Sequence, residues 1–222
     1  MRGIRVTVGG LMSVDGKIAP ADRQGRKFFR FMTPRHRRLL HRIRSGVDAV
    51  VVGVETIIAD DPSLTVRDAK GPNPIRVVLD SKARTPLDSK LLNGQAPTIV
   101  AVTRDAPRRR IMKLRKKAKV LVQKRHGRVD PTELLRELKT LGIQKVLVEG
   151  GGEIRWSFFK ANLVDDFFVW VAPYVWGGRE APTLVDGTGF INETEAVPLR
   201  LVRSRVVDNL LILSFSVKRS HV

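Results

Sequence analysis

A carboxylate followed by three glycines is the part of this sequence best suited to chemistry. Glu149 comes directly after the apolar run 146–148 and precedes the glycines 150–152, and an amphipathic run opens at Glu153. A buried strand, a glycine turn and a helix are the simplest interpretation. Glycine lets the backbone approach a ligand closely, and the free N–H groups that open a helix favour an anion such as a pyrophosphate. The alternative is a tight strand-to-helix turn without a ligand, since neither of the two best-known phosphate-loop motifs is present.

Two further pairs of residues have spacings that could serve a site. Thr56 and Asp60 are four residues apart and would share one face of a helical turn. There they could hold a ligand hydroxyl or carboxamide, or they could form a network at a helix end. Asp15 and Lys17 flank a glycine in an Asp-Gly turn, so we expect both to project from a loop after the first strand.

The elements that must position these residues alternate between strands and helices. Strand-like runs occupy residues 4–8, 49–52, 74–81, 98–104, 120–122 and 146–148, and the runs 74–81 and 98–104 end in polar residues. Helices are expected after Thr33-Pro34, after Pro107, from Asp130 to Gly142 and after the glycine turn. This order predicts a mainly parallel sheet with helices on its faces, whose carboxyl edge carries the site.

The last quarter of the chain departs from this alternation. Residues 166–172 and 210–217 are strand-like, with no clear helix between them. They are expected to close one side of the sheet as a strand pair, which would make it a mixed sheet. With no repeat and no linker, the prediction is one α/β domain spanning residues 1–222.

Composition argues against several classes of protein. The 222 residues contain no cysteine, so disulfides, Cys-ligated zinc and a thiol nucleophile are absent, which suits the cytoplasm. No metal site is expected, because the four histidines lack the spacing of a zinc motif. No apolar run approaches the roughly 20 residues that span a bilayer, so no membrane association is expected.

The net charge of +19 is concentrated in two stretches. Nine Lys and Arg and no acid lie between Arg23 and Arg44, and twelve against one acid lie between Arg104 and Arg128. Such stretches attract polyanions and phosphorylated metabolites. The alternative is a pair of solvated helix faces. That alternative is favoured over nucleic acid because the stretches lack the interleaved aromatic residues of a single-strand binder.

Several ordered motifs together resemble those of the riboflavin-pathway reductases with the dihydrofolate-reductase-like fold. The resemblance is closest to the stand-alone reductases that act on a ribosylamino-pyrimidine 5′-phosphate. It spans nearly the whole chain and is carried by residues 13–19, 53–56, 60–67, 73–81, 148–152 and 172–183. It implies a three-layer fold, a homodimer, and NADPH-dependent reduction of the ribosylamino group to its ribitylamino form, with NADH possible as a substitute. The hydride would pass to C1′ of the ring-opened imine.

The resemblance also implies roles for particular residues. The cofactor would lie against Met12, Thr56, Asp60, Ser81, Gly151, Gly152, Glu153, Ile154, Arg155, Trp156 and Ser157. The phosphorylated pyrimidine would contact Arg44, Leu64, Arg67 and Glu149. Candidates for the proton donor are Asp60, Glu149 and Lys17, and Arg104 is a candidate contact for a 2′-phosphate. Arginines suit a phosphate, and a carboxylate can accept hydrogen bonds from ribose hydroxyls or pyrimidine amines.

One segment departs from the family pattern and keeps other hypotheses open. The family usually carries a Gly-x-Ser-x-Trp-like segment before the first helix, where this chain reads Gly-Arg-Lys-Phe-Phe-Arg-Phe-Met at 25–32. A second hypothesis is therefore a reductase of the same fold that acts on the deaminated pyrimidine or on a pterin. A third is a nucleic-acid-binding module that uses the basic stretches. The chain lacks the cysteines of the zinc deaminase that is fused to larger relatives.

Overall fold

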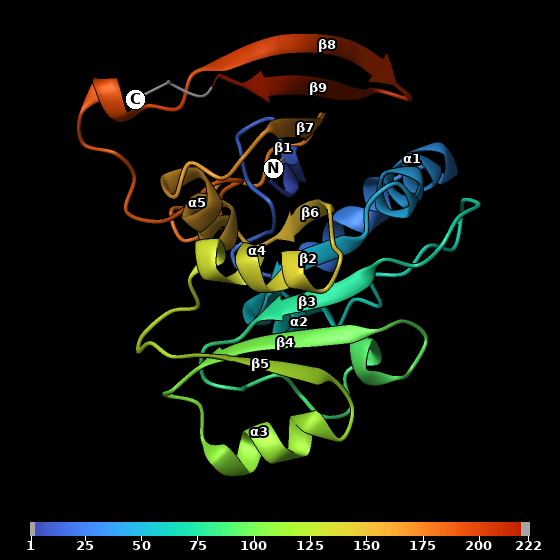
Figure 1. Cartoon of the computed structure of the whole chain (residues 1–222). Coiled ribbons are helices and arrows are strands. Elements are labelled where there is room, and N and C mark those ends of the chain that lie inside the picture. Colours follow the sequence, from blue (N-terminus) through green and yellow to red (C-terminus); the bar gives the residue numbers. More distant parts are fainter. Residues whose placement is uncertain (1–2, 219–222) are drawn as a thin grey trace.

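A nine-stranded twisted sheet organises the computed structural model, which describes residues 3–218 (Figure 1). The strands are β1 (Arg5–Ser13), β2 (Ala49–Gly53), β3 (Ile75–Leu79), β4 (Thr98–Thr103), β5 (Lys119–Gln123), β6 (Lys145–Gly150), β7 (Asp166–Ala172), β8 (Leu199–Val207) and β9 (Leu210–Val217). Their order across the sheet is β5-β4-β3-β2-β6-β1-β7-β9-β8. Strands β1 to β7 are mutually parallel, whereas β9 runs antiparallel to β7 and to β8. The predicted mixed, mainly parallel sheet is confirmed.

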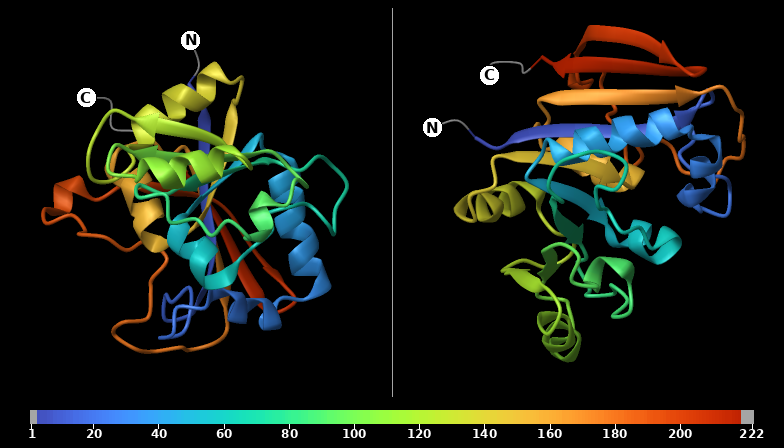
Figure 2. Two further views of the ribbon diagram at one scale, coloured as in Figure 1. Left: turned by 90° about the horizontal axis from the view of Figure 1, so that it is seen from below. Right: turned by 90° about the vertical axis from the view of Figure 1, so that its right-hand side faces the viewer.

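Helices cover both faces of the sheet (Figure 2). The α-helices are α1 (Pro34–Ser45), α2 (Val54–Asp60), α3 (Arg108–Arg115), α4 (Pro131–Thr140) and α5 (Gly152–Lys160). The chain also contains three short 3-10 helices within the described residues: η1 (Gly25–Phe31), η2 (Lys90–Leu92) and η3 (Glu193–Glu195). One apolar cluster joins the sheet to α1, α2 and α3, and a second joins its other face to α4 and α5. This is the expected three-layer arrangement.

The central strands are apolar on both faces because both faces are covered. In β2, Val50 and Val52 face the first cluster, while Ala49 and Val51 face the second. All five residues of β2 are buried, as is usual for a parallel strand between two helix layers. The continuous apolar runs in the sequence therefore reflect burial on both sides.

The predicted helix starts are confirmed at α1 and α4. Thr33 caps α1 by accepting from the His36 N–H, while the Thr33 N–H donates to His36 Nδ1, and Pro34 follows as the first helical residue. Asp130 caps α4 by accepting from the Thr132 N–H.

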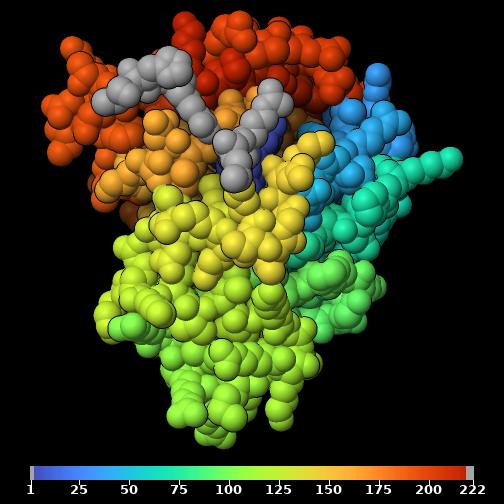
Figure 3. Space-filling view, viewed as in Figure 1, coloured from blue at the N-terminus to red at the C-terminus, as the bar shows by residue number. Residues whose placement is uncertain are grey.

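The β8–β9 hairpin forms one end of the molecule and α3 the opposite end (Figure 3). The prediction that 166–172 and 210–217 pair is confirmed, because β7 and β9 are neighbours. The sequence analysis missed β8, whose residues are exposed apart from Val207. As the outermost strand it pairs with β9 alone, and Arg and Ser interrupt its apolar residues, so no continuous apolar run marks it in the sequence.

Candidate active site

A cavity of about 890 Å³ opens at the carboxyl ends of β1, β2, β3 and β6. Its lining comes from β1, the end of β2, β7, η1, α1, α2, the residues after β3, residues 127–129, the turn between β6 and α5, and the segment around Pro182. Parallel strands deliver their carboxyl ends to one edge, so the cavity lies where ligands of open α/β sheets bind.

The turn between β6 and α5 forms one wall of this cavity. Gly151 has φ +80°, a left-handed conformation that favours glycine. The next residue starts α5, and a Cβ atom on Gly152 would lie 2.6 Å from the Thr183 carbonyl oxygen and 2.7 Å from Asp186 Oδ2. Gly152 is therefore required by packing, and the predicted glycine turn before a helix is confirmed as a structure.

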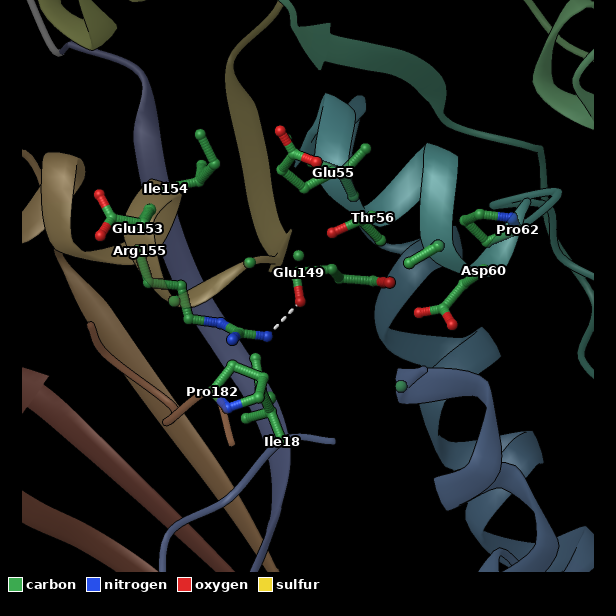
Figure 4. Close-up of a pocket in the computed structure, with 18 of the residues that line it drawn as sticks. Ile18, Glu55, Thr56, Asp60, Pro62, Glu149, Glu153, Ile154, Arg155 and Pro182 are labelled. Carbon is green, nitrogen blue, oxygen red and sulfur yellow. Dashed lines mark hydrogen bonds between the residues drawn. The ribbon is translucent and has the colours of Figure 1, made fainter. Parts of the chain in front are cut away.

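Helix α2 forms the facing wall and carries Thr56 and Asp60 (Figure 4). Both line the cavity from one face of the helix, as their spacing predicts. Thr56 lies against the glycine turn, since a Cβ atom on Gly150 would be 2.9 Å from its Oγ1. Asp60 is half-buried and accepts a hydrogen bond from the Arg26 N–H at 2.9 Å. Burial raises the pKa of its carboxyl, and the bond from Arg26 opposes that rise.

A buried ion pair joins α1 to the end of β6. Arg44 donates to Glu149 through Nε to Oε1 at 2.7 Å and through Nη2 to Oε2 at 2.6 Å. Its Nη1 donates to the Thr65 carbonyl oxygen at 3.3 Å. Burial works to lower the pKa of Arg44, but the charge of Glu149 and the hydrogen bonds to its carboxylate together outweigh burial, so the pKa is raised. Arg44, Glu149 and Leu64 all line the cavity.

His41, one turn before Arg44 on α1, holds the segment that follows Leu64. Its Nδ1 accepts from the N–H groups of Arg67 at 3.2 Å and Asp68 at 2.8 Å. Burial, followed by the charge of Arg44, lowers the pKa of this imidazole. The neutral ring is the form that can accept at Nδ1, so the contact and the pKa agree.

Most of the expected site residues lie together. The cavity lining contains Thr56, Asp60, Ser81, Gly151, Gly152, Glu153, Ile154, Arg155 and Ser157 of the expected cofactor set, and Arg44, Leu64 and Glu149 of the expected substrate set. These residues come from five stretches of sequence, brought together by the carboxyl edge of the sheet.

Five expected residues lie outside the cavity lining. Lys17 donates to the Ala181 carbonyl oxygen at 3.1 Å, and Met12 packs on the second apolar cluster. Trp156 is buried against Phe190, with ring centroids 4.7 Å apart. The exposed Arg67 and Arg104 side chains also fall outside it.

Several cavity residues were not predicted from the sequence. Exposed cations line the cavity near Ser81, namely Lys82, Arg84 and Arg128, and Arg84 and Arg128 pair with Glu55 and Glu153. Lys82 directly follows Ser81 at the end of a predicted strand, which is the signal that could have identified it. Apolar lining residues at the other end of the cavity, including Phe28 and Trp170, carry no sequence signal of a site, because in sequence they cannot be told from residues of the hydrophobic core.

The second basic stretch forms α3, β5 and their flanks. Part of its charge is used in local structure: Arg110 donates to the carbonyl oxygens of Ala83 and Thr85, and Lys117 to that of Leu87. Exposed cations of α3, including Arg108, Arg109 and Lys113, and Lys116 directly after the helix lie beyond the cavity lining. They are solvated helix residues, as the simpler interpretation of the charge expects.

The described part of the chain contains no group of three or more His, Cys, Asp or Glu placed to hold a metal ion. Within the same residues, no helix is long and apolar enough to cross a membrane.

Comparisons with known proteins identify the family of the chain. A family profile described as the RibD C-terminal domain matches residues 5–213. The 2,5-diamino-6-ribosylamino-4(3H)-pyrimidinone 5′-phosphate reductase of Methanothermobacter thermautotrophicus is 41% identical over 96% of this chain and 98% of its own length. The protein of the same name from Archaeoglobus fulgidus is 39% identical over 82% of this chain and 85% of its own length.

A solved structure extends the agreement to the fold. The structure of a pyrimidine reductase-like protein from Corynebacterium diphtheriae superposes with a TM-score of 0.81 at 18% identity, covering 98% of this chain and 93% of that one. At that identity the likeness concerns the fold alone. The family match and the identity along nearly the full length lead to one conclusion: this chain belongs to the RibD C-terminal domain family.

Proposed function

We propose that the chain is a 2,5-diamino-6-ribosylamino-4(3H)-pyrimidinone 5′-phosphate reductase of riboflavin biosynthesis that uses NADPH and acts as one reductase domain. The observation that carries the proposal is the single cavity in which Thr56, Asp60, Ser81 and the glycine turn face the Arg44–Glu149 pair. Relatives named for this reaction are 38 to 41% identical to the chain, which supports the same substrate.

The residues present suit a dinucleotide. The glycine turn leaves no room for a side chain at its third position, Gly152, and opens a nine-residue helix whose free N–H groups favour a pyrophosphate. Thr56 and Asp60 offer a hydroxyl and a carboxylate on the facing wall. When bound, the nicotinamide supplies the hydride, and the chain binds, orients and shields the reacting groups.

The Arg44–Glu149 pair suits the pyrimidine and its ribosylamine. Glu149 is held in one orientation by two charge-assisted bonds, and its remaining lone pairs can accept from hydroxyl or amine groups of the substrate. Reduction of the imine carbon C1′ needs one hydride and one proton. Asp60 and Glu149 are the proposed proton-donor candidates, and Asp60 is favoured because its raised pKa keeps it protonated to higher pH. Lys17 is not proposed for this role, because it bonds a carbonyl outside the cavity lining.

The preference for NADPH is proposed from the cations around Ser81. Lys82, Arg84 and Arg128 line the cavity where β3 ends, and a 2′-phosphate adds about two negative charges for them to meet. Arg104 is replaced as the candidate because it lies outside the cavity lining. Lys82→Ala is expected to reduce the ratio of kcat/KM for NADPH to that for NADH. An unchanged ratio in Lys82→Ala and Arg84→Ala would remove both residues from this role.

A homodimer is proposed through the β8–β9 hairpin. Leu201, Val202 and Val206 of the edge strand are 56%, 61% and 69% exposed. Exposed apolar side chains on an edge strand are commonly covered by a partner. Light scattering should give a mass of two chains, and Val202→Lys should shift it towards one.

The experiment that tests the function follows oxidation of NADPH with the diaminopyrimidine ribosylamine phosphate and, separately, with its deaminated analogue. Oxidation with the first and formation of the ribitylamino product support the proposal. The alternative substrate is favoured by one observation, namely that the altered segment places the apolar Phe28 and Phe29 in the lining. Faster oxidation with the deaminated analogue would select that alternative, and no oxidation with either would reject both.

A further inference from the structure

Arg155 is a buried guanidinium that contacts three separate segments around the cavity. Its side chain is 3% exposed and runs back from α5 beneath the glycine turn. Nε donates to the Gly9 carbonyl oxygen at 3.1 Å and Nη1 to the Leu184 carbonyl oxygen at 3.1 Å. Nη2 donates to the carbonyl oxygen of Glu149, the bond drawn in Figure 4. One side chain thus ties the end of β6 to β1 and to the segment around Leu184.

The contact with Glu149 falls where the sheet is irregular. In the pairing of β2 with β6, Val51 is opposite Val148 and Val52 is opposite Gly150, so Glu149 is the extra residue of a bulge. The pairing of β1 with β6 ends at Val148. Across the described strands, Glu149 therefore has a register partner on neither side. A bulge leaves its extra residue unpaired and aims it locally, and Arg155 supplies a donor to the carbonyl there.

The surroundings of Arg155 are built to accept a buried guanidinium. Among residues 3–218, no carboxylate oxygen lies within ion-pair distance of its guanidinium, so its partners are neutral carbonyls. Burying a charge without an ion-pair partner costs free energy, and burial lowers the pKa of Arg155 to about 10, although the charges of Glu149 and Asp186, beyond ion-pair distance, act to raise it. A Cβ atom on Gly10 would lie 2.7 Å from Nη2, so the glycine leaves room for the guanidinium.

Glu149 is consequently fixed at two points. Arg44 holds its carboxylate from α1, and Arg155 holds its backbone from α5. Arg155 lies in the cavity lining, as expected for the cofactor set, but all three of its side-chain nitrogen atoms donate to backbone carbonyls.

We propose that Arg155 is a positioning residue for Glu149, holding the bulge at the end of β6 so that the carboxylate meets the substrate. This inference rests on the proposed function, in which Glu149 contacts the pyrimidine ribosylamine. It adds a residue that acts through Glu149 and does not touch the reacting atoms.

A double-mutant cycle tests the proposal. Arg155→Met, Glu149→Ala and the combination are assayed with NADPH and the diaminopyrimidine ribosylamine phosphate. Arg155→Met should lower kcat roughly 100-fold, the cost of a misplacement near 1 Å, while the KM for NADPH stays within about threefold of wild type. In the Glu149→Ala background the same change should alter kcat by less than about threefold, because the residue through which it acts is gone.

Two further variants separate positioning from a general effect on folding. Lys160→Met removes an exposed cation from the end of the same helix and should leave kcat unchanged. Arg155→Lys keeps the charge and a donor, so its loss of kcat should be smaller than that of Arg155→Met. If Arg155→Met does not yield folded protein, Arg155→Lys takes its place in the cycle.

The outcomes distinguish this inference from the proposed function. Equal losses from Arg155→Met in both backgrounds would overturn the inference and leave the role of Glu149 intact. Wild-type kinetics in Glu149→Ala would remove Glu149 from the substrate site and overturn both. A loss confined to the background that retains Glu149 supports both.

Discussion

Removing the arginine of the buried Arg44–Glu149 pair should destabilise the protein far more than removing an arginine from a surface pair. Arg44→Met deletes two bonds to the Glu149 carboxylate and one to the Thr65 carbonyl oxygen. The side chains of Arg44 and Glu149 are 7% and 12% exposed, so water cannot replace the lost partner in full. An uncompensated carboxylate remains inside the fold.

The magnitude follows from that burial. Breaking a buried pair on one side costs about 3–5 kcal/mol, because one charge is left without its partner. For a chain of this size each kcal/mol corresponds to about 2–4 °C, so the melting temperature should fall by roughly 6–20 °C. Replacing both residues, in Arg44→Met with Glu149→Met, should recover most of the loss, since an apolar pair needs no charge compensation.

Urea unfolding of the variants measures the effect. Arg5→Met is the matched control, because Arg5 forms a two-bond pair with Asp166 in which its own side chain is 67% exposed. That control should lose no more than about 1 kcal/mol. The reasoning is refuted if Arg44→Met loses no more than the control, or if the double variant is as unstable as Arg44→Met.

Three further predictions concern single residues. The folded pKa of His41 lies below its unfolded value, so the free energy of unfolding should fall as pH drops from about 6.5 towards the folded pKa. In His41→Asn the midpoint of urea unfolding should not show this fall over the same pH range. The folded pKa of Asp60 is raised, so its ionised form disfavours folding at neutral pH. Calorimetry at neutral pH should therefore show no loss of stability in Asp60→Asn, while assays of the same variant should show reduced turnover. Gly152→Ala should weaken NADPH binding and lower the melting temperature, because its Cβ would lie 2.7 Å from Asp186. Gly46→Ala, with contacts of 3.5 Å or more, is the control and should do neither.

The sequence predicted the architecture well because burial leaves a direct mark on it. Buried parallel strands appear as uninterrupted apolar runs, and the polar residues that end them meet at one edge. Thr56, Asp60, Ser81 and the glycine turn could be expected together on that basis, and they line one cavity. Strand β8 left no such mark because it is an exposed edge.

The finer arrangement depends on contacts between distant residues, which spacing does not encode. Arg44 and Glu149 are 105 positions apart, and their pairing depends on how α1 packs against the sheet. The bulge at Glu149 and its support by Arg155 follow from strand register, which the apolar pattern of a fully buried strand does not fix. Lys17 donates to the Ala181 carbonyl oxygen, outside the cavity lining, and this contact between residues 164 positions apart cannot be read from their spacing either.

The central claim is that one cavity holds the cofactor against Thr56 and the pyrimidine against Glu149. The most direct test measures the KM for NADPH and kcat/KM for the diaminopyrimidine ribosylamine phosphate in Thr56→Val and Glu149→Gln. The account predicts a crossed pattern, in which Thr56→Val raises the KM for NADPH and Glu149→Gln lowers kcat/KM for the pyrimidine while leaving the KM for NADPH near that of wild type. Two variants that change the same parameter, or none, would contradict it.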